Sequence, residues 1–162
     1  MPDGNSILFH DWTGPSALGS ALKIVELNSL KVSAISEAKD LFLPAVSPDG
    51  RYVASAAVDG QKLMLMELRT RNWSELLKMN VGSISWSPDS KYVYFDTGLS
   101  KDAAFFRLRI ADRKLERVAD LRGLRRVVFA GFPWSGITPD GAPLLLRDTS
   151  SQEVYALDFE AP

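Results

Sequence analysis

The fold is decided by one stretch, Val46-Ser47-Pro48-Asp49-Gly50-Arg51-Tyr52-Val53, which returns as Trp86-Ser87-Pro88-Asp89-Ser90-Lys91-Tyr92-Val93. In such a turn, proline presets φ, the aspartate side chain bonds nearby backbone and glycine tolerates a positive φ. Related segments occur at Pro2-Asp3-Gly4 and Pro139-Asp140-Gly141, so the four aspartates are separated by 46, 40 and 51 residues. Four turns at this period indicate a repeat protein.

The residues around each turn repeat as well. A hydroxyl lies two positions before the aspartate at Ser47, Ser87 and Thr138. Two departures stand out, because Ser90 replaces the turn glycine and Met1 stands where the first hydroxyl is expected. An apolar residue lies four positions after each aspartate, at Ile7, Val53, Val93 and Leu144.

Each repeat contains short β-rich runs, which we name strands A to D, with the Pro-Asp turn joining A to B. Four strands in about 40–50 residues are the unit of a β-propeller blade. We therefore predict an all-β propeller of four-stranded antiparallel blades, with about four blades present, in one domain over residues 1–162. For the second blade the predicted strands are residues 43–47, 52–58, 63–68 and 74–77. The predicted repeats are residues 1–40, 41–79, 80–121 and 122–162.

The two quoted segments, together with the closing stretch from Thr138 to Asp148, resemble the repeat of TolB-like, WD-repeat-like bacterial β-propellers. The resemblance covers nearly the whole chain. It implies a propeller of the kind that is attached, in large bacterial proteins, to a winged-helix or a serine/threonine kinase domain. Neither domain is recognised in these residues. The motif identifies a fold rather than a function, because propellers carry many unrelated activities.

Strand counting predicts an incomplete ring. The first repeat begins at its turn and so lacks strand A, and the last ends in strand C, at residues 154–159, and so lacks strand D. The two termini do not complement one another. We favour a part of a longer propeller, with copies that associate through open blade edges as the alternative. A closed four-bladed ring is the less favoured alternative.

Composition argues against most kinds of catalysis. The 162 residues have a formal net charge of −1, no cysteine and a single histidine. These counts exclude disulfides, thiolate metal sites and a multi-histidine metal site within one chain. His10 lies at the end of a predicted strand, and the Gly-x-Ser-x-Gly elbow of serine hydrolases does not occur. We predict no enzyme, no cofactor and no metal.

The predicted function is a non-catalytic interaction, scaffold or sensory module within a larger bacterial protein. The alternative is the propeller part of a peptidase, lactonase or glycosidase whose catalytic groups lie at the channel mouth or on another domain. Compartment stays open between cytoplasm and periplasm. We expect a protein partner, no nucleic acid and no membrane insertion, since no apolar run is long enough to span a bilayer.

The B–C and D–A loops of a propeller build one mouth of its channel, where binding residues are expected. The speculative binding residues are Trp12, Asp59, Lys101, Arg125, Arg126 and Asp148. The long loop Gly123–Pro133 mixes cationic and apolar residues, which suits a protein partner. Residues 101–126 hold nine Lys or Arg against four acids. We expect a solvated blade edge there, with a basic patch for an acidic partner as the alternative.

Overall fold

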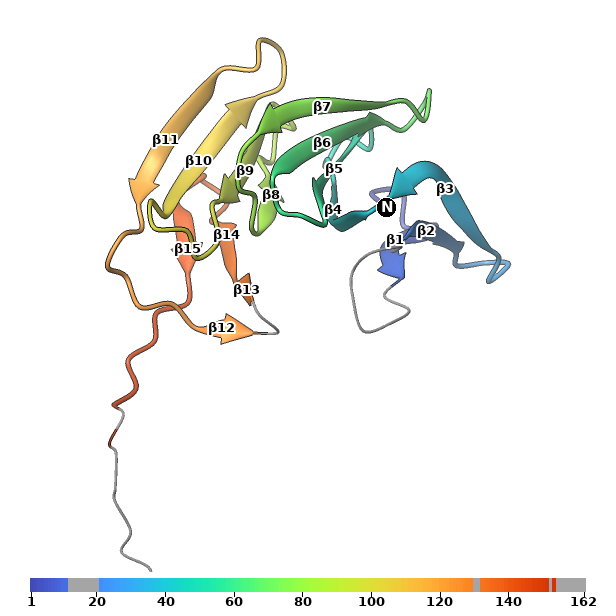
Figure 1. The fold of residues 1–162 in the computed structure, drawn as a ribbon. Helices are drawn as coiled ribbons and strands as arrows, with labels where there is room; N and C mark the ends of the chain where they lie inside the picture. Colours follow the sequence, from blue (N-terminus) through green and yellow to red (C-terminus); the bar gives the residue numbers. More distant parts are fainter. Residues whose placement is uncertain (12–20, 130–131, 152, 154–162) are drawn as a thin grey trace, which may run out of the picture.

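The structure is a computed structural model that describes residues 1–11, 21–129, 132–151 and 153, and these residues form strands and turns without helix. Two complete four-stranded antiparallel sheets lie at its centre, and a three-stranded sheet precedes them. The sheets follow one another in an arc (Figure 1). The first sheet contains β1 (Ser6–Asp11), β2 (Ala21–Glu26) and β3 (Val32–Lys39).

The second and third sheets each have the strand order A-B-C-D expected of a blade. The second contains β4 (Leu41–Val46), β5 (Tyr52–Ala57), β6 (Lys62–Glu67) and β7 (Trp73–Lys78). The third contains β8 (Ile84–Trp86), β9 (Tyr92–Asp96), β10 (Ala104–Arg109) and β11 (Leu115–Asp120). Strand β1 lies against β4, β4 against β8, and β8 against β14 (Ser135–Ile137), so the inner strands of successive blades face one another.

The fourth sheet is described in part. Its strand β14 pairs with β15 (Pro143–Leu145), and the predicted strand at 154–159 lies outside the described residues. The segment expected to be a loop at Gly123–Pro133 contains a short hairpin, β12 (Val128–Phe129) and β13 (Phe132–Pro133). The predicted all-β blades are confirmed, and among the described residues the first sheet has the three strands β1 to β3.

The repeated turn is a small hydrogen-bond network. The Ser47 hydroxyl donates to Asp49 Oδ1 at 2.6 Å and accepts the Tyr52 N–H at 2.9 Å. The backbone N–H of Arg51 donates to the same carboxylate oxygen at 3.0 Å. Ser87 and Asp89 repeat these contacts at 2.7–3.1 Å. The hydroxyl and the carboxylate therefore close the turn together, which explains why they recur in the sequence.

The fourth turn is one residue shorter than the second and third. Ser87 N–H donates to the carbonyl of Tyr92, whereas Thr138 N–H donates to that of Ala142. As a result Val93 pairs with Trp86, but Leu144 pairs with Gly136. The predicted equivalence of Leu144 with Val93 is therefore wrong by one residue.

The inner strand of the second blade begins earlier than predicted, at Leu41, so that only Asp40 separates it from β3. Its register with β5 shifts between Phe42 and Ala45. Pro44 lies in this interval and has no N–H to donate to the ladder, so a bulge is the expected solution. Ser55 reaches across it, donating its hydroxyl to the Phe42 carbonyl at 2.7 Å.

Apolar side chains pack between neighbouring sheets rather than in one central core. Leu22, Ile35, Val53 and Met66 are buried between the first and second sheets. Phe95 and Phe105 are among the largest fully buried side chains, and they lie on opposite sides of the third sheet. Each sheet thus depends on a neighbour for burial, which is the stability pattern of a repeat architecture.

Candidate functional site

The predicted mouth residues lie in the loops that join B to C and in the connections between sheets. Asp59 lies between β5 and β6, Lys101 lies between β9 and β10, and Arg125 and Arg126 follow β11. Asp148 follows β15, and Trp12 lies outside the described residues. The structure separates these residues into two places rather than one.

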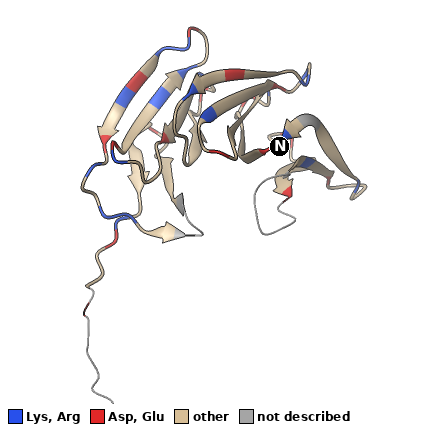
Figure 2. Ribbon diagram, viewed as in Figure 1, with Lys and Arg blue, Asp and Glu red and all other residues tan. Residues whose placement is uncertain are grey.

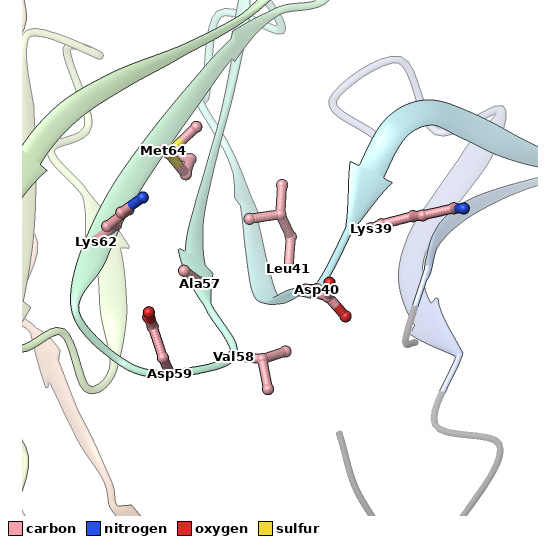
Figure 3. A pocket seen from close by; sticks show the side chains of 8 residues that line it. All are labelled: Lys39, Asp40, Leu41, Ala57, Val58, Asp59, Lys62 and Met64. Carbon is pink, nitrogen blue, oxygen red and sulfur yellow. The ribbon is translucent and has the colours of Figure 1, made fainter. Parts of the chain in front are cut away.

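The first place is a pocket of about 360 Å³ beside the junction of the first and second sheets (Figure 3). Asp59 lines it from the β5–β6 turn, where its carboxylate accepts the Gln61 N–H at 2.8 Å. Asp40 lines it from the short link between sheets. Lys39 and Lys62 also line this pocket, so its charges are balanced and do not select an anion or a cation.

The second place is centred on Arg126, whose side chain is 2% exposed. Its Nη1 lies 3.5 Å from Oδ2 of Asp96, which is fully buried, and its Nη2 donates to the Gly98 carbonyl. A binding residue at the mouth was expected at this position. Arg126 joins the third sheet to the segment that leads into the fourth. Its guanidinium is buried, and the buried carboxylate of Asp96 provides the opposite charge that such a cation needs.

Asp96 was not singled out from the sequence, although it organises this region. Its carboxylate accepts the Gly98 N–H at 2.5 Å and the Ser135 hydroxyl of β14. Gly82 lies so close that an added Cβ would be 2.3 Å from Asp96 Oδ1. The available signal was a carboxylate at the end of an otherwise apolar strand, Tyr92–Asp96. These hydrogen bonds and the ion pair connect the third and fourth sheets.

The structure brings Arg125 and Asp148 together. Their side chains form an ion pair at 3.4 Å, and Arg125 also donates to the Ser150 carbonyl. The Ser150 hydroxyl and N–H, followed by the nearby Arg125, lower the pKa of Asp148. Lys101 and Arg126 line a separate pocket of about 150 Å³. The two pockets with predicted residues thus lie at different junctions.

The basic stretch does not form a continuous basic surface. Figure 2 shows red and blue residues together on β11, beside the blue residues of β10. Arg107 and Lys114 both pair with Glu116, at 2.6 and 3.0 Å. Arg122 makes a bidentate contact with Asp120, from Nε to Oδ1 and from Nη2 to Oδ2, and lowers the pKa of that carboxyl to about 2. The paired cations favour the expected solvated blade edge over a patch for an acidic partner.

The described residues offer few groups for chemistry. His10 lies in β1 opposite Leu22. Within residues 1–11, 21–129, 132–151 and 153, no three His, Cys, Asp or Glu side chains gather as metal ligands. No helix in the described part of the chain has the length and apolarity to cross a bilayer.

Comparison with solved structures identifies the architecture. TolB from Acinetobacter baumannii aligns with 93% of this chain and 37% of its own, at 20% identity and a TM-score of 0.67. The β-propeller domain of the trilobed protease from Pyrococcus furiosus aligns with 94% of this chain and 54% of its own, at 14% identity and a TM-score of 0.61. An oligogalacturonate lyase from Vibrio parahaemolyticus aligns with 76% of this chain and 39% of its own, at 15% identity and a TM-score of 0.61.

These likenesses confirm the predicted TolB-like β-propeller fold. The chain spans only 37–54% of the length of these three proteins. No protein-family model and no curated protein matches the sequence. The neighbours include TolB, the β-propeller domain of a protease and an oligogalacturonate lyase, so the fold is shared across different functions.

Proposed function

We propose that this chain is a non-catalytic protein-interaction module, the scaffold or sensory propeller of a larger bacterial protein. Its partner surfaces are the two end faces of the arc, and their occupants are further propeller sheets of the same kind. The proposal is supported by one observation, which is that positions buried between the middle sheets are exposed at both ends.

At the first end, Ile7 holds the place in its sheet that Val53 holds in the second. Ile7 pairs with Val25 as Val53 pairs with Met66. Val53 is fully buried, whereas Ile7 is 49% exposed. On the same sheet Val32, opposite Val25, is also exposed. The first sheet therefore exposes apolar side chains at positions that are buried in the second sheet.

At the other end, the register of the fourth sheet places Leu144 where Tyr94 lies in the third. Tyr94 is 5% exposed because the fourth sheet covers it, and Leu144 is 41% exposed. Leu146 and Trp134 are exposed nearby in the chain. Several large apolar residues on one sheet face favour a protein contact. The edge strand β11 is less suited, since it carries the Arg117–Asp120 ion pair.

Sedimentation velocity of the purified chain over a range of concentrations tests the proposal. We expect concentration-dependent association that Ile7→Lys or Leu144→Lys weakens. Val118→Lys, an exposed position on β11, is the matched control and should leave association unchanged. A monomer at all concentrations would contradict the proposed end faces.

A second candidate is the propeller part of a hydrolase or lyase, which is supported by the fold it shares with the trilobed protease and the oligogalacturonate lyase. The purified chain can be assayed on peptide, ester, lactone and glycoside substrates. If activity on any of these substrates stays with the chain through further purification, the non-catalytic proposal is wrong.

A further inference from the structure

The clefts between successive Pro-Asp turns differ from one another, although the turns repeat. These clefts lie on the face opposite the predicted mouth, and the function proposed above does not use them. In the cleft between the second and third sheets, the Trp86 ring stacks on Tyr52 with centroids 6.3 Å apart and planes at 13°. The Trp86 indole N–H donates to the Ala45 carbonyl at 2.9 Å. An aromatic ring therefore fills this cleft.

Ser90 closes the same cleft. It takes a positive φ of 60° at the position where the other turns have glycine. Its hydroxyl accepts the Asp49 N–H of the preceding turn at 3.0 Å. The departure from Pro-Asp-Gly thus joins two neighbouring turns directly.

The cleft between the third and fourth sheets has neither the tryptophan ring nor the turn serine. Its place equivalent to Trp86 is taken by the smaller Ile137, and that equivalent to Ser90 is taken by Gly141. A pocket of about 290 Å³ remains there. Tyr92, Tyr94, Asp89 and Asp140 line it, together with the two turn prolines. The open cleft is a consequence of two substitutions in the repeat.

Two carboxylates line this pocket, those of Asp89 and Asp140. The Ser87 hydroxyl and the Lys91 N–H lower the pKa of Asp89, and the Thr138 hydroxyl lowers that of Asp140, so both carboxylates are ionised at neutral pH. Lys91 pairs with Asp89 at 3.2 Å. No lysine or arginine among the described residues forms an ion pair with Asp140. Asp140 is therefore available to a cation from outside.

The tyrosines define the shape of the ligand. Tyr92 already has the guanidinium of Arg107 at 5.1 Å from its ring centroid, and Tyr52 has that of Arg51 at 5.2 Å. Rings at this position of the repeat therefore accept planar cations. A guanidinium is flat like the indole that fills the middle cleft, and its donors match a carboxylate in a bidentate contact.

We propose that the cleft between the turns of Asp89 and Asp140 binds an arginine side chain of a peptide. The guanidinium stacks in the space that Trp86 fills one blade earlier and donates to Asp140. The first cleft, lined by Asp3 and Asp49 together with Met1, Pro2 and Gly50, has two carboxylates but no ring. This first cleft serves as a comparison within the same molecule, because a ligand that needed only carboxylates would also bind there.

Titration of the ¹⁵N-labelled chain with Nα-acetyl-arginine amide, followed by amide chemical shifts, tests this site. We expect saturable shifts at Gly141 and Ser90 and none at Gly4. The citrulline derivative keeps the shape of arginine but has no charge, and it should bind about tenfold more weakly or worse. The lysine derivative should also bind more weakly, because its ammonium is not planar.

Asp140→Asn should weaken binding about tenfold, whereas the matched variant Asp3→Asn in the first turn should leave it unchanged. Added salt should weaken binding to the unmodified chain, which keeps the test valid if a variant fails to fold. Equal binding of the arginine and citrulline derivatives, shifts centred on the first cleft, or no saturation would each overturn the proposal. Equal binding of the lysine derivative would overturn the assignment to a planar cation.

Discussion

Two junctions in this molecule hold neighbouring sheets by different means. The second and third sheets meet through Trp86 stacked on Tyr52 at the turn end. The third and fourth sheets are tied at the mouth end by buried Asp96 and Arg126, while their turn end stays open. The same repeat can therefore connect neighbouring sheets at the turn end or at the mouth end of a blade.

Loss of the Trp86 ring should have the largest effect on stability. Trp86→Ala removes a buried ring and its hydrogen bond, and we expect it to lower the free energy of unfolding by about 3–5 kcal/mol. Urea denaturation followed by circular dichroism measures this. Leu99→Ala, at an exposed position, is the control and should change stability by less than about 0.5 kcal/mol. A small effect of Trp86→Ala would mean that the middle junction does not depend on its ring.

The ion pair at the other junction is the next test. Arg126→Ala leaves Asp96 buried without its cation, and we expect a loss of about 3 kcal/mol in the free energy of unfolding. Asp96→Ala should cost a similar amount, and the double variant much less than the sum, since each single change leaves a buried charge. Urea denaturation of all four proteins gives the coupling energy. Simple additivity would show that the two residues act independently.

The sequence predicts the sheets well because their signals are local. Strand β5 was expected at 52–58 and spans Tyr52–Ala57, and β6 was expected at 63–68 and spans Lys62–Glu67. Turn chemistry and short runs of apolar and small residues, such as Leu63–Met66 in β6, set these limits without distant contacts. The three strands of the first sheet, as far as the described residues show it, agree with the same counting.

What the sequence could not predict depends on contacts between sheets. Arg126 and Asp96 are 30 positions apart, and their pairing is decided by how the third and fourth sheets meet. The shorter fourth turn is not evident from the positions of the aspartates, because the missing residue comes after Asp140. Among the predicted site residues that the structure describes, one pair, Arg125 and Asp148, forms an ion pair.

Ser90 offers a smaller test of why the middle cleft is closed. Ser90→Ala keeps the positive φ but removes the acceptor of the Asp49 N–H, and should cost about 1 kcal/mol of unfolding free energy. Ser90→Gly also loses the acceptor, but it relieves a backbone conformation that costs about 1 kcal/mol for a residue with a side chain. We therefore expect Ser90→Gly to be more stable than Ser90→Ala in thermal denaturation. The reverse order would indicate that strain at this position is negligible.

The smallest expected effect is a pH dependence of stability at the Asp89 turn, which borders the clefts on both sides of the third sheet. Because the Ser87 hydroxyl and the Lys91 N–H lower the pKa of Asp89 below its ordinary value of 3.8, the folded state binds that proton less readily than the unfolded state. The stability from this carboxylate is therefore fully present above the unfolded pKa and is lost as the pH falls through the folded pKa.

The difference in unfolding free energy between the unmodified chain and Asp89→Asn should accordingly be constant at neutral pH and shrink as the pH falls below about 4. Urea denaturation at a series of pH values measures this difference. Ser87→Ala removes the first of the two hydrogen bonds, so the pKa of Asp89, followed by NMR of its carboxyl carbon, should rise toward 3.8. An unchanged pKa in that variant would mean that the turn hydroxyl, although repeated in three blades, does not stabilise the charged carboxylate.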